Sequence, residues 1–269
     1  MMKFYTFFIL KYLFFNNQSF IWRSKRNKFE VVNMIKSIDI NLLIGINRQK
    51  KTLKNNTINF AKGNFTNNAL LWGARGNGKS TLIKSMFNHV SKDYTSLKLI
   101  QLKKSNINDI EKIYLILSKF NDLRFIIFID DLSFEKIDID YKIIKSSLDG
   151  SIQNQPSNII LYITSNRLHL MSRDMIDNER SSAIHTHENV EEKISLSDRF
   201  GLWIGFHNIS QEEYLNIIKN YCNHYKIDYS NQDLKDSIKW SLQRGNRTGR
   251  TAWQYIIQLA STKNLKISF

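Results

Sequence analysis

The chain has 269 residues, enough for one large domain or two modest ones with a sizeable core. Its 42% hydrophobic and 23% charged residues are typical of a globular protein and exclude a disordered one. The formal charge of +15 permits attraction to nucleic acid or an anionic membrane, but the basic residues are spread along the chain, which favours a general enrichment in lysine. The single cysteine, Cys222, excludes an intramolecular disulfide and indicates a reducing compartment such as the cytoplasm.

The first residues of the chain are strongly apolar. The run at 4–15 contains Lys11 and is too short to span a bilayer. No small-residue cleavage site follows it, so secretion is the least favoured interpretation. We favour a segment packed on the main domain or a start codon placed too early, and peripheral membrane contact through residues 4–15 is the remaining alternative. The densest basic cluster follows, at 23–28.

No flexible linker divides the chain, because Pro156 is its only proline and the glycines are clustered. From residue 69 onward, short apolar runs alternate with stretches of helical spacing, which predicts a parallel sheet flanked by helices. The predicted strands are 69–72, 97–102, 124–129, 158–164 and 202–206, and the predicted helices between them are 80–91, 109–120 and 140–148.

After residue 206 the strand patterns stop. Ser210 and Glu213 form a predicted capping box, which opens a helix to about residue 225. Two more helical patterns follow, near 231–243 and 250–262. We therefore predict an α/β fold with three parts: an N-terminal extension at 1–38, an α/β core at 39–207 and a helical subdomain at 208–269.

The stretch LLWGARGNGKSTL at 70–82 contains the pattern G-x-x-x-x-G-K-[ST] between a predicted strand and a predicted helix. Its glycines let backbone N–H groups turn toward phosphate oxygens, and the helix adds its positive N-terminal end. We expect Lys79 to reach the terminal phosphates and Ser80 to ligate Mg²⁺. No guanine-reading Asn-Lys-x-Asp is present, so ATP is favoured over GTP. The predicted nucleotide contacts are Gly73, Ala74, Arg75, Gly76, Asn77, Gly78, Lys79, Ser80 and Thr81.

Two carboxylates follow the apolar strand at 124–129. Asp130 is placed to hold the Mg²⁺ shell, directly or through water, and Asp131 is placed to polarise the attacking water. The strand at 158–164 ends in Thr-Ser-Asn-Arg, and the amide of Asn166 can orient the same water. The three strand ends together predict a hydrolytic phosphate site.

These elements, with the helical C-terminal region, resemble the AAA+ ATPases, a class of P-loop NTPases with a helical lid. The resemblance implies that Asn166 is the sensor 1 residue and that Arg250, or alternatively Arg247, is the sensor 2 residue. It also implies an ATP-dependent homo-oligomer, in which Arg199 acts as an arginine finger on the neighbouring subunit's site.

The segment 42–50 resembles the part of AAA+ proteins that packs on adenine, which implies base contacts at Ile44 and Gly45. The sequence is similar, over about residues 20–262, to one bacterial family of predicted AAA+ ATPases of unknown function. The stretches that carry this resemblance are LLWGARGNGKS, DDLSFE at 130–135, TSNRLHLM at 164–171, VEEKISLSDRFGLW at 190–203 and LQRGNRTGRTAWQ at 242–254.

One position departs from the wider AAA+ pattern, where the strand ends in Asp-Glu. Asp131 is one methylene shorter than glutamate, and misplacing a base by about 1 Å can cost on the order of 10²-fold in rate. Glu135 is an alternative base, although an acid starting a helix is favoured there. A metal site at His185, His187 and Glu188 lacks further ligands of recognisable spacing, so we favour a loop.

We therefore predict an AAA+ ATPase that hydrolyses Mg-ATP and acts on an unknown protein or nucleic-acid client. One alternative is a nucleotide-gated assembly switch with little turnover, and another is a nucleic-acid-associated module similar to a helicase loader. The predicted metal ligands are Ser80 and Asp130, and the predicted catalytic residues are Lys79, Asp131, Asn166, Arg199 and Arg250.

Overall fold

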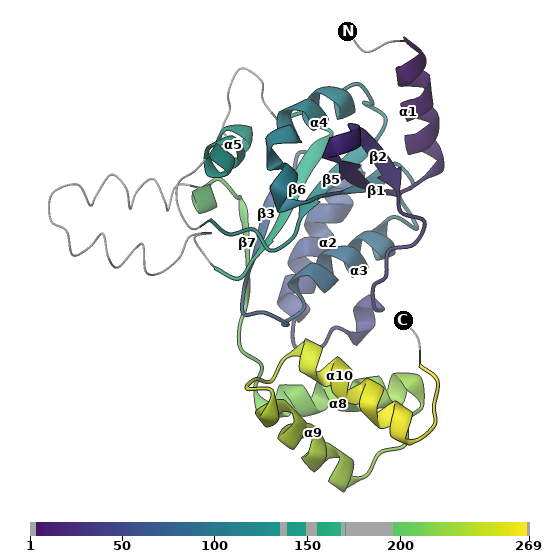
Figure 1. The fold of residues 1–269 in the computed structure, drawn as a ribbon, viewed down its shortest axis with the longest axis vertical. Helices are drawn as coiled ribbons and strands as arrows, with labels where there is room; N and C mark the ends of the chain where they lie inside the picture. The colour runs from purple at the N-terminus through teal and green to yellow at the C-terminus, as the bar shows by residue number, and fades with distance from the viewer. Residues whose placement is uncertain (1–3, 135–138, 149–154, 168–169, 171–195, 268–269) are drawn as a thin grey trace, which may run out of the picture.

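The computed structural model describes residues 4–134, 139–148, 155–167, 170 and 196–267 (Figure 1). Within them, seven strands form one sheet in the order β2-β1-β4-β5-β6-β3-β7. Neighbouring strands are parallel except for the antiparallel hairpin of β1 and β2 at one edge. The strands are β1 (Ser19–Arg23), β2 (Lys28–Val31), β3 (Ala69–Gly73), β4 (Leu97–Leu102), β5 (Arg124–Ile129), β6 (Ile159–Ser165) and β7 (Leu202–Phe206).

Helices cover both faces of this sheet (Figure 1). One buried cluster joins Leu71 and Phe128 to α2, α3 and the C-terminal helices, and a second joins Leu70 and Ile127 to α1, α4 and α5. Successive strand residues thus point to opposite faces, and both faces are buried, as expected for a parallel sheet. The helices are α1 (Phe4–Asn16), α2 (Asn47–Ala61), α3 (Lys79–Val90), α4 (Ile110–Leu117), α5 (Ile139–Leu148), α8 (Gln211–Tyr225), α9 (Asn231–Gln243) and α10 (Gly249–Thr262).

The predicted parallel α/β architecture is confirmed. Strands β4, β5 and β7 have the predicted bounds, β3 ends one residue later than predicted, and β6 both begins and ends one residue later. Helix α4 is shorter than the predicted 109–120. A 3-10 helix at Lys104–Asp109 precedes it. After α4 the chain continues in a tighter turn, in which the N–H groups of Lys119 and Phe120 each donate to the carbonyl oxygen three residues earlier.

The apolar N-terminal run packs on the main body of the protein, as favoured from the sequence. Phe14 of α1 is fully buried, with edge-to-face ring contacts to Phe20, Phe120 and Phe125. The hairpin of β1 and β2 follows and joins the sheet beside β4, a pairing that the sequence did not predict. Among the described residues, no helix is both long and apolar enough to cross a membrane.

The three C-terminal helices form a compact group at the lower end of the sheet in Figure 1. Each begins with a hydroxyl cap: the Ser210, Ser230 and Thr248 side chains accept bonds from backbone N–H groups three residues later. The predicted box of Ser210 and Glu213 is complete in both directions. Tyr214 and Ile218 of α8 and Ile256 of α10 join the α2 and α3 core cluster, so these helices are anchored to the sheet.

Candidate nucleotide site

Strands β5, β6 and β3 are neighbours, so their carboxyl ends bring three separate sequence motifs to one edge of the sheet. Lys79, the first residue of α3, is the centre of this edge. Its ammonium donates to the carbonyl oxygens of Gly73 at 2.6 Å and Ala74 at 2.8 Å, and to Oδ1 of Asn166 at 3.1 Å. The phosphate loop therefore closes on its own lysine.

Glycine is required at two positions of the loop. Gly73 has φ +131°, and a Cβ there would stand 2.1 Å from the carbonyl oxygen of Phe206 on β7. Gly76 has φ +82°, and a Cβ there would stand 2.9 Å from Oγ1 of Thr248, the cap of α10. Any L side chain would therefore strain the backbone and collide with a neighbouring element.

The serine after Lys79 faces the first aspartate. The hydroxyl of Ser80 donates to Oδ1 of Asp130 at 2.5 Å, and the hydroxyl of Thr164 on β6 donates to the same oxygen at 2.6 Å. Hydroxyl and carboxylate oxygens are the donors that Mg²⁺ prefers. Ser80 and Asp130 therefore fit the predicted metal role by chemistry and by proximity.

The second aspartate adopts a backbone conformation that is unusual for its type. Asp131 has φ +53°, in the left-handed region, and its N–H donates to Oγ1 of Thr164 at 2.9 Å. Its carboxylate accepts a bond from Nδ2 of Asn166 and lies 3.4 Å from the guanidinium of Arg75. Asn166 thus bridges Lys79 and Asp131, which places all three side chains in one polar network.

Burial lowers the pKa of the Lys79 ammonium to about 8, although the neighbouring carboxylates of Asp131 and Asp130 raise it. Arg75 and Arg250 contribute a smaller lowering. A phosphate group beside this ammonium would supply a further negative charge and would favour the protonated form. The lysine is therefore suited to an anionic ligand.

These residues line a cavity of about 740 Å³, the phosphate-loop cavity. Arg250 lies on its wall, and its backbone N–H donates to the carbonyl of Gly76 at 3.1 Å, so α10 is fastened to the loop. Arg247 is not among the described residues of this wall. The lining residues are Lys36, Ser37, Ile38, Leu43, Arg75, Gly76, Gly78, Lys79, Ser80, Thr81, Lys84, Asp130, Asp131, Thr164, Asn166, Tyr221, Gly249, Arg250 and Trp253.

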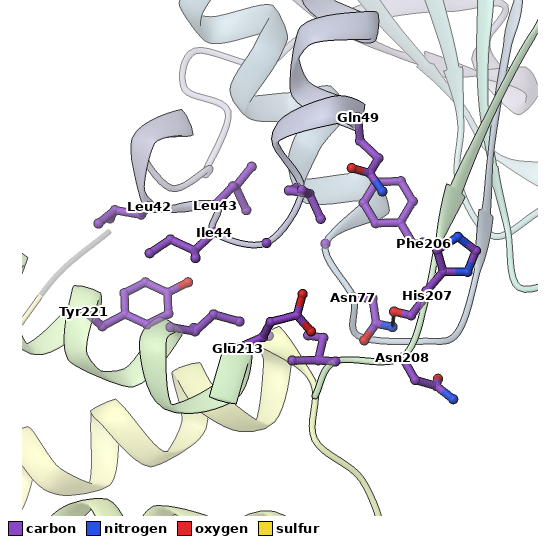
Figure 2. Close-up of a pocket in the computed structure, with 16 residues that line it drawn as sticks. Leu42, Leu43, Ile44, Gln49, Asn77, Phe206, His207, Asn208, Glu213 and Tyr221 are labelled. Atoms are coloured by element: carbon purple, nitrogen blue, oxygen red, sulfur yellow. Dashed lines mark hydrogen bonds between the residues drawn. The ribbon is translucent and has the colours of Figure 1, made fainter. Parts of the chain in front are cut away.

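A second cavity, of about 140 Å³, adjoins the first and shares Leu43, Gly78, Tyr221 and Gly249 with it. We call it the apolar cavity. In Figure 2, Ile44 and Tyr221 lie on one side and Asn77 and His207 on the other. Its walls are Leu42, Leu43, Ile44, Gly45, Ile46, Gln49, Asn77, Gly78, Phe206, His207, Asn208, Ile209, Glu213, Ile217, Tyr221 and Gly249.

The apolar cavity contains Ile44 and Gly45, the two residues expected at the base. It also contains Asn77 and Gly78, which were predicted as nucleotide contacts, and residues of the segment 206–221 that the sequence did not predict. Asn77 is 7% exposed, and its Nδ2 donates to the carbonyl of His207 at 2.8 Å. Glu213 faces Gly45, with a carboxylate oxygen 3.6 Å from where a Cβ would stand. Ile209, Glu213 and Tyr221 come from the segment after β7 and from α8, which carry no local signal for this position.

Other predicted residues lie elsewhere. Arg199 is half-buried just before β7 and is not among the described residues that line the phosphate-loop cavity. Glu135 and the group of His185, His187 and Glu188 lie outside the described residues. Within the described part of the chain, no group of three or more His, Cys, Asp and Glu side chains could hold a metal ion.

The sheet order, the phosphate loop and the helical lid define a P-loop NTPase fold of the AAA+ class. The chain belongs to the family described as Protein of unknown function (DUF815), which it matches over residues 16–263. This confirms the family resemblance expected from the sequence. No curated protein matches the chain.

Solved structures support the fold at low sequence identity. A variant of RuvB from Thermotoga maritima is 18% identical, with a TM-score of 0.54, over 84% of this chain and 66% of that one. Domain III of the replication initiation protein DnaA from Thermotoga maritima is 13% identical, with a TM-score of 0.53, over 87% of this chain and 94% of that one. A chain of the HORMA:CdnC:Trip13 complex from E. coli is 10% identical, with a TM-score of 0.52, over 81% of this chain and 90% of that one.

Proposed function

We propose that this protein binds Mg-ATP between its α/β core and its helical lid and hydrolyses it to act on a protein or nucleic-acid client in the cytoplasm. The observation that supports this most is the convergence of Lys79, Ser80, Asp130 and Asn166 at the carboxyl ends of three neighbouring strands. In this proposal, residues 1–38 are the N-terminal extension, 39–207 the α/β core and 208–269 the helical lid.

The phosphate-loop cavity would hold the phosphates and the apolar cavity would hold the adenine. Lys79 and the loop N–H groups bind the phosphate oxygens, and Ser80 and Asp130 hold Mg²⁺. Mg²⁺, when bound, offsets the negative charge of the phosphates. Ile44 and Gly45 line the apolar cavity, which adjoins the loop at Gly78.

Two residues would prepare the attacking water. Asp131 accepts its proton, and Asn166, which bonds both Asp131 and Lys79, holds the water in line with the γ-phosphate. Arg250 contacts the phosphates of its own subunit from the lid, consistent with its place on the cavity wall. Arg199 acts on the site of a neighbouring subunit, so we expect an ATP-dependent homo-oligomer and slow hydrolysis by a monomer.

Phosphate release over many turnovers tests this proposal. We expect release by the wild type with Mg²⁺, and a loss of about 10²-fold or more in Asp131→Asn, because a general base contributes about that much. Asp131→Glu restores the usual AAA+ length and should hydrolyse at least as fast as the wild type. If Asp131→Glu brings no gain and Asp131→Asn no loss, Asp131 is not the base.

A nucleotide-gated switch is the second candidate. The observation that favours it is that the Asp131 carboxylate already contacts Asn166 and Arg75. These contacts compete with a hydrogen bond from the attacking water to the same carboxylate. Phosphate release over many turnovers, measured on samples that are also sized with and without ATP and Mg²⁺, separates the two. A switch assembles with ATP and releases no phosphate, whereas an ATPase assembles and turns over. If ATP drives no assembly, the role of Arg199 on a neighbouring site is wrong.

A further inference from the structure

A second buried lysine, Lys98 on β4, has no partner for its charge. Lys98 is 2% exposed, and no hydrogen bond or ion pair with a described residue reaches its ammonium. Lys79, by contrast, is 7% exposed and donates three hydrogen bonds. Burying a charge without a partner destabilises a folded protein, so Lys98 is a candidate for a role in binding.

The Lys98 side chain remains charged at neutral pH. Burial lowers the pKa of its ammonium to about 8, and no carboxylate of a described residue opposes that lowering. A group with this pKa is still mostly protonated at pH 7. A positive charge therefore lies inside the protein, and the described residues supply no negative charge to match it.

Lys98 lines a cavity of about 520 Å³ at the end of α1 and the amino ends of β1 and β4, which we call the Lys98 cavity. Leu97 and Leu99 belong to the cluster of α2 and α3, so Lys98 points to the other face of the sheet, where α1 lies. The cavity wall carries amides of five described residues and no described Asp or Glu. These amides belong to Asn16, Asn17, Gln18, Asn33 and Asn88.

Four of these amides are oriented by the chain itself. Nδ2 of Asn16 and Nδ2 of Asn17 donate to the carbonyl oxygens four residues earlier, at 2.8 and 2.9 Å. Nε2 of Gln18 donates to the carbonyl of Ser91 at 3.1 Å, and Nδ2 of Asn88 donates to a carbonyl and a hydroxyl before α2. Because a carbonyl only accepts, each amide must present its NH₂ group to it. Their four oxygens receive no hydrogen bond from a described group, so they are left as acceptors.

The end of α1 cannot serve as the counterion of Lys98. The amides of Asn16 and Asn17 already occupy two of its last carbonyl oxygens, those of Tyr12 and Leu13. A helix end carries only about half an elementary charge, which offsets part of the lysine charge. The cavity therefore has one unmatched cation and several free acceptors.

We propose that the Lys98 cavity binds a small organic acid with one carboxylate and several N–H donors, as a free α-amino acid has. The carboxylate pairs with the Lys98 ammonium, and the N–H groups donate to the amide oxygens of the wall. A phosphate dianion fits less well, because a single ammonium cannot match its charge and the wall offers it mainly acceptors.

This site is separate from the proposed ATP site. The Lys98 cavity shares no described residue with the phosphate-loop cavity or with the apolar cavity. It lies at the amino ends of the strands, whereas the phosphate loop lies at their carboxyl ends. The two proposals can therefore fail independently.

Calorimetric titration of the full chain with each of the standard amino acids tests the proposal. We expect at least one of them to bind the wild type. The hydroxy acid of the same carbon skeleton should bind more weakly, and the acid with neither group more weakly still. Each lost donor leaves a buried acceptor of the wall without its bond. Inorganic phosphate at the same ionic strength should bind more weakly than the amino acid.

Lys98→Met removes the charge and keeps an unbranched apolar side chain. Affinity for the amino acid should fall about 30-fold or more, as when one partner of a buried charge pair is truncated. The melting temperature without ligand should stay the same or rise, because the variant no longer buries an unpaired charge. Asn33→Asp adds a carboxylate at an exposed wall residue whose side chain bonds no described group, and repulsion should lower affinity about fivefold.

Lys92→Met and Asn64→Asp are the matched controls, because they make the same changes at exposed residues outside the three cavities. Both should bind the amino acid as the wild type does. If no amino acid binds the wild type, or if Lys98→Met binds it equally well, the proposal is wrong. Tighter binding of phosphate or of the hydroxy acid overturns the assigned ligand class. ATP affinity, measured on the same variants, should not change, so a failure here is distinct from a failure of the proposed ATPase.

Discussion

The two ends of the candidate nucleotide site are built in opposite ways. At the phosphate end, charged and polar side chains already bond one another, as in the series Lys79, Asn166 and Asp131. At the base end, aliphatic and aromatic groups, with several polar ones, line the apolar cavity from four separate segments of the chain. Phosphate chemistry needs fixed charges at fixed positions, whereas a base needs an apolar slot of the right width. The first can be written in a short motif, and the second is formed by folding.

The largest effect should come from the phosphate end. Lys79→Ala removes the central ammonium and leaves the Gly73 and Ala74 carbonyls without their donor. We expect ATP affinity to fall by about 100-fold, the usual result of truncating one member of a buried charged pair. Inorganic triphosphate should lose affinity to the same extent, because the lost contact is to phosphate. Equilibrium binding by calorimetry measures both.

Lys92→Ala is the control for this experiment, because Lys92 is an exposed lysine just beyond the end of α3. It should bind ATP as the wild type does. If Lys79→Ala also retains wild-type affinity for both ligands, the phosphates do not bind at the loop and the proposed function is wrong.

The pH dependence should be the next largest effect. The pKa of Lys79 in the free protein is lowered to about 8, and a bound phosphate should raise it. Binding ATP above that pH therefore takes up a proton, so affinity falls as pH rises past about 8 and approaches a tenfold loss per pH unit. Below about pH 7 the ammonium is already formed, and this contribution is flat.

The titration should be followed by calorimetry in buffers of different ionisation enthalpy, which count the protons taken up. Lys79→Arg keeps its charge across this range, so its affinity should not decline in the same way. A wild-type profile that matches that of Lys79→Arg would show that Lys79 does not control the decline.

The smallest effect should come from the base end. Ile44→Val removes one methylene from the wall of the apolar cavity, and we expect ATP affinity to fall about threefold, since a buried methylene is worth about 0.8 kcal/mol. Binding of inorganic triphosphate should not change. Ile139→Val, at a residue that is 72% exposed on α5, is the control and should leave both ligands unaffected. Equal losses for both ligands would mean that the base does not lie against Ile44.

Much of the fold could be predicted because most of its strands can be recognised from short stretches of sequence. The run RFIIFI in β5 is apolar throughout, as a strand buried on both faces must be. The lid helices were predicted from Ser210 and Glu213 and from helical spacing. The hairpin of β1 and β2 was not predicted. Its strands are four and five residues long and surround a basic turn, and what stabilises it is tertiary: Trp22 is buried and its ring N–H bonds Asp109.

The site was predictable where one motif supplies the chemistry. Ser80 and Asp130 were expected to meet from the loop and the strand end, and their oxygens are in contact. The left-handed backbone of Asp131 and its bond from Asn166 depend on Thr164 and on the pairing of β5 with β6, which no short stretch encodes. Glu213 was predicted only as a helix cap, yet it also lines the apolar cavity, because the fold brings the start of α8 to Gly45.

The most direct test of the central claim is a crystal structure of this protein with Mg²⁺ and a non-hydrolysable ATP analogue. We predict phosphates against Lys79, the metal ion held by Ser80 and Asp130, and the adenine in the apolar cavity between Ile44 and Tyr221. An analogue bound with its phosphates away from Lys79, or with its base outside that cavity, would contradict the proposal that the two cavities form one ATP site.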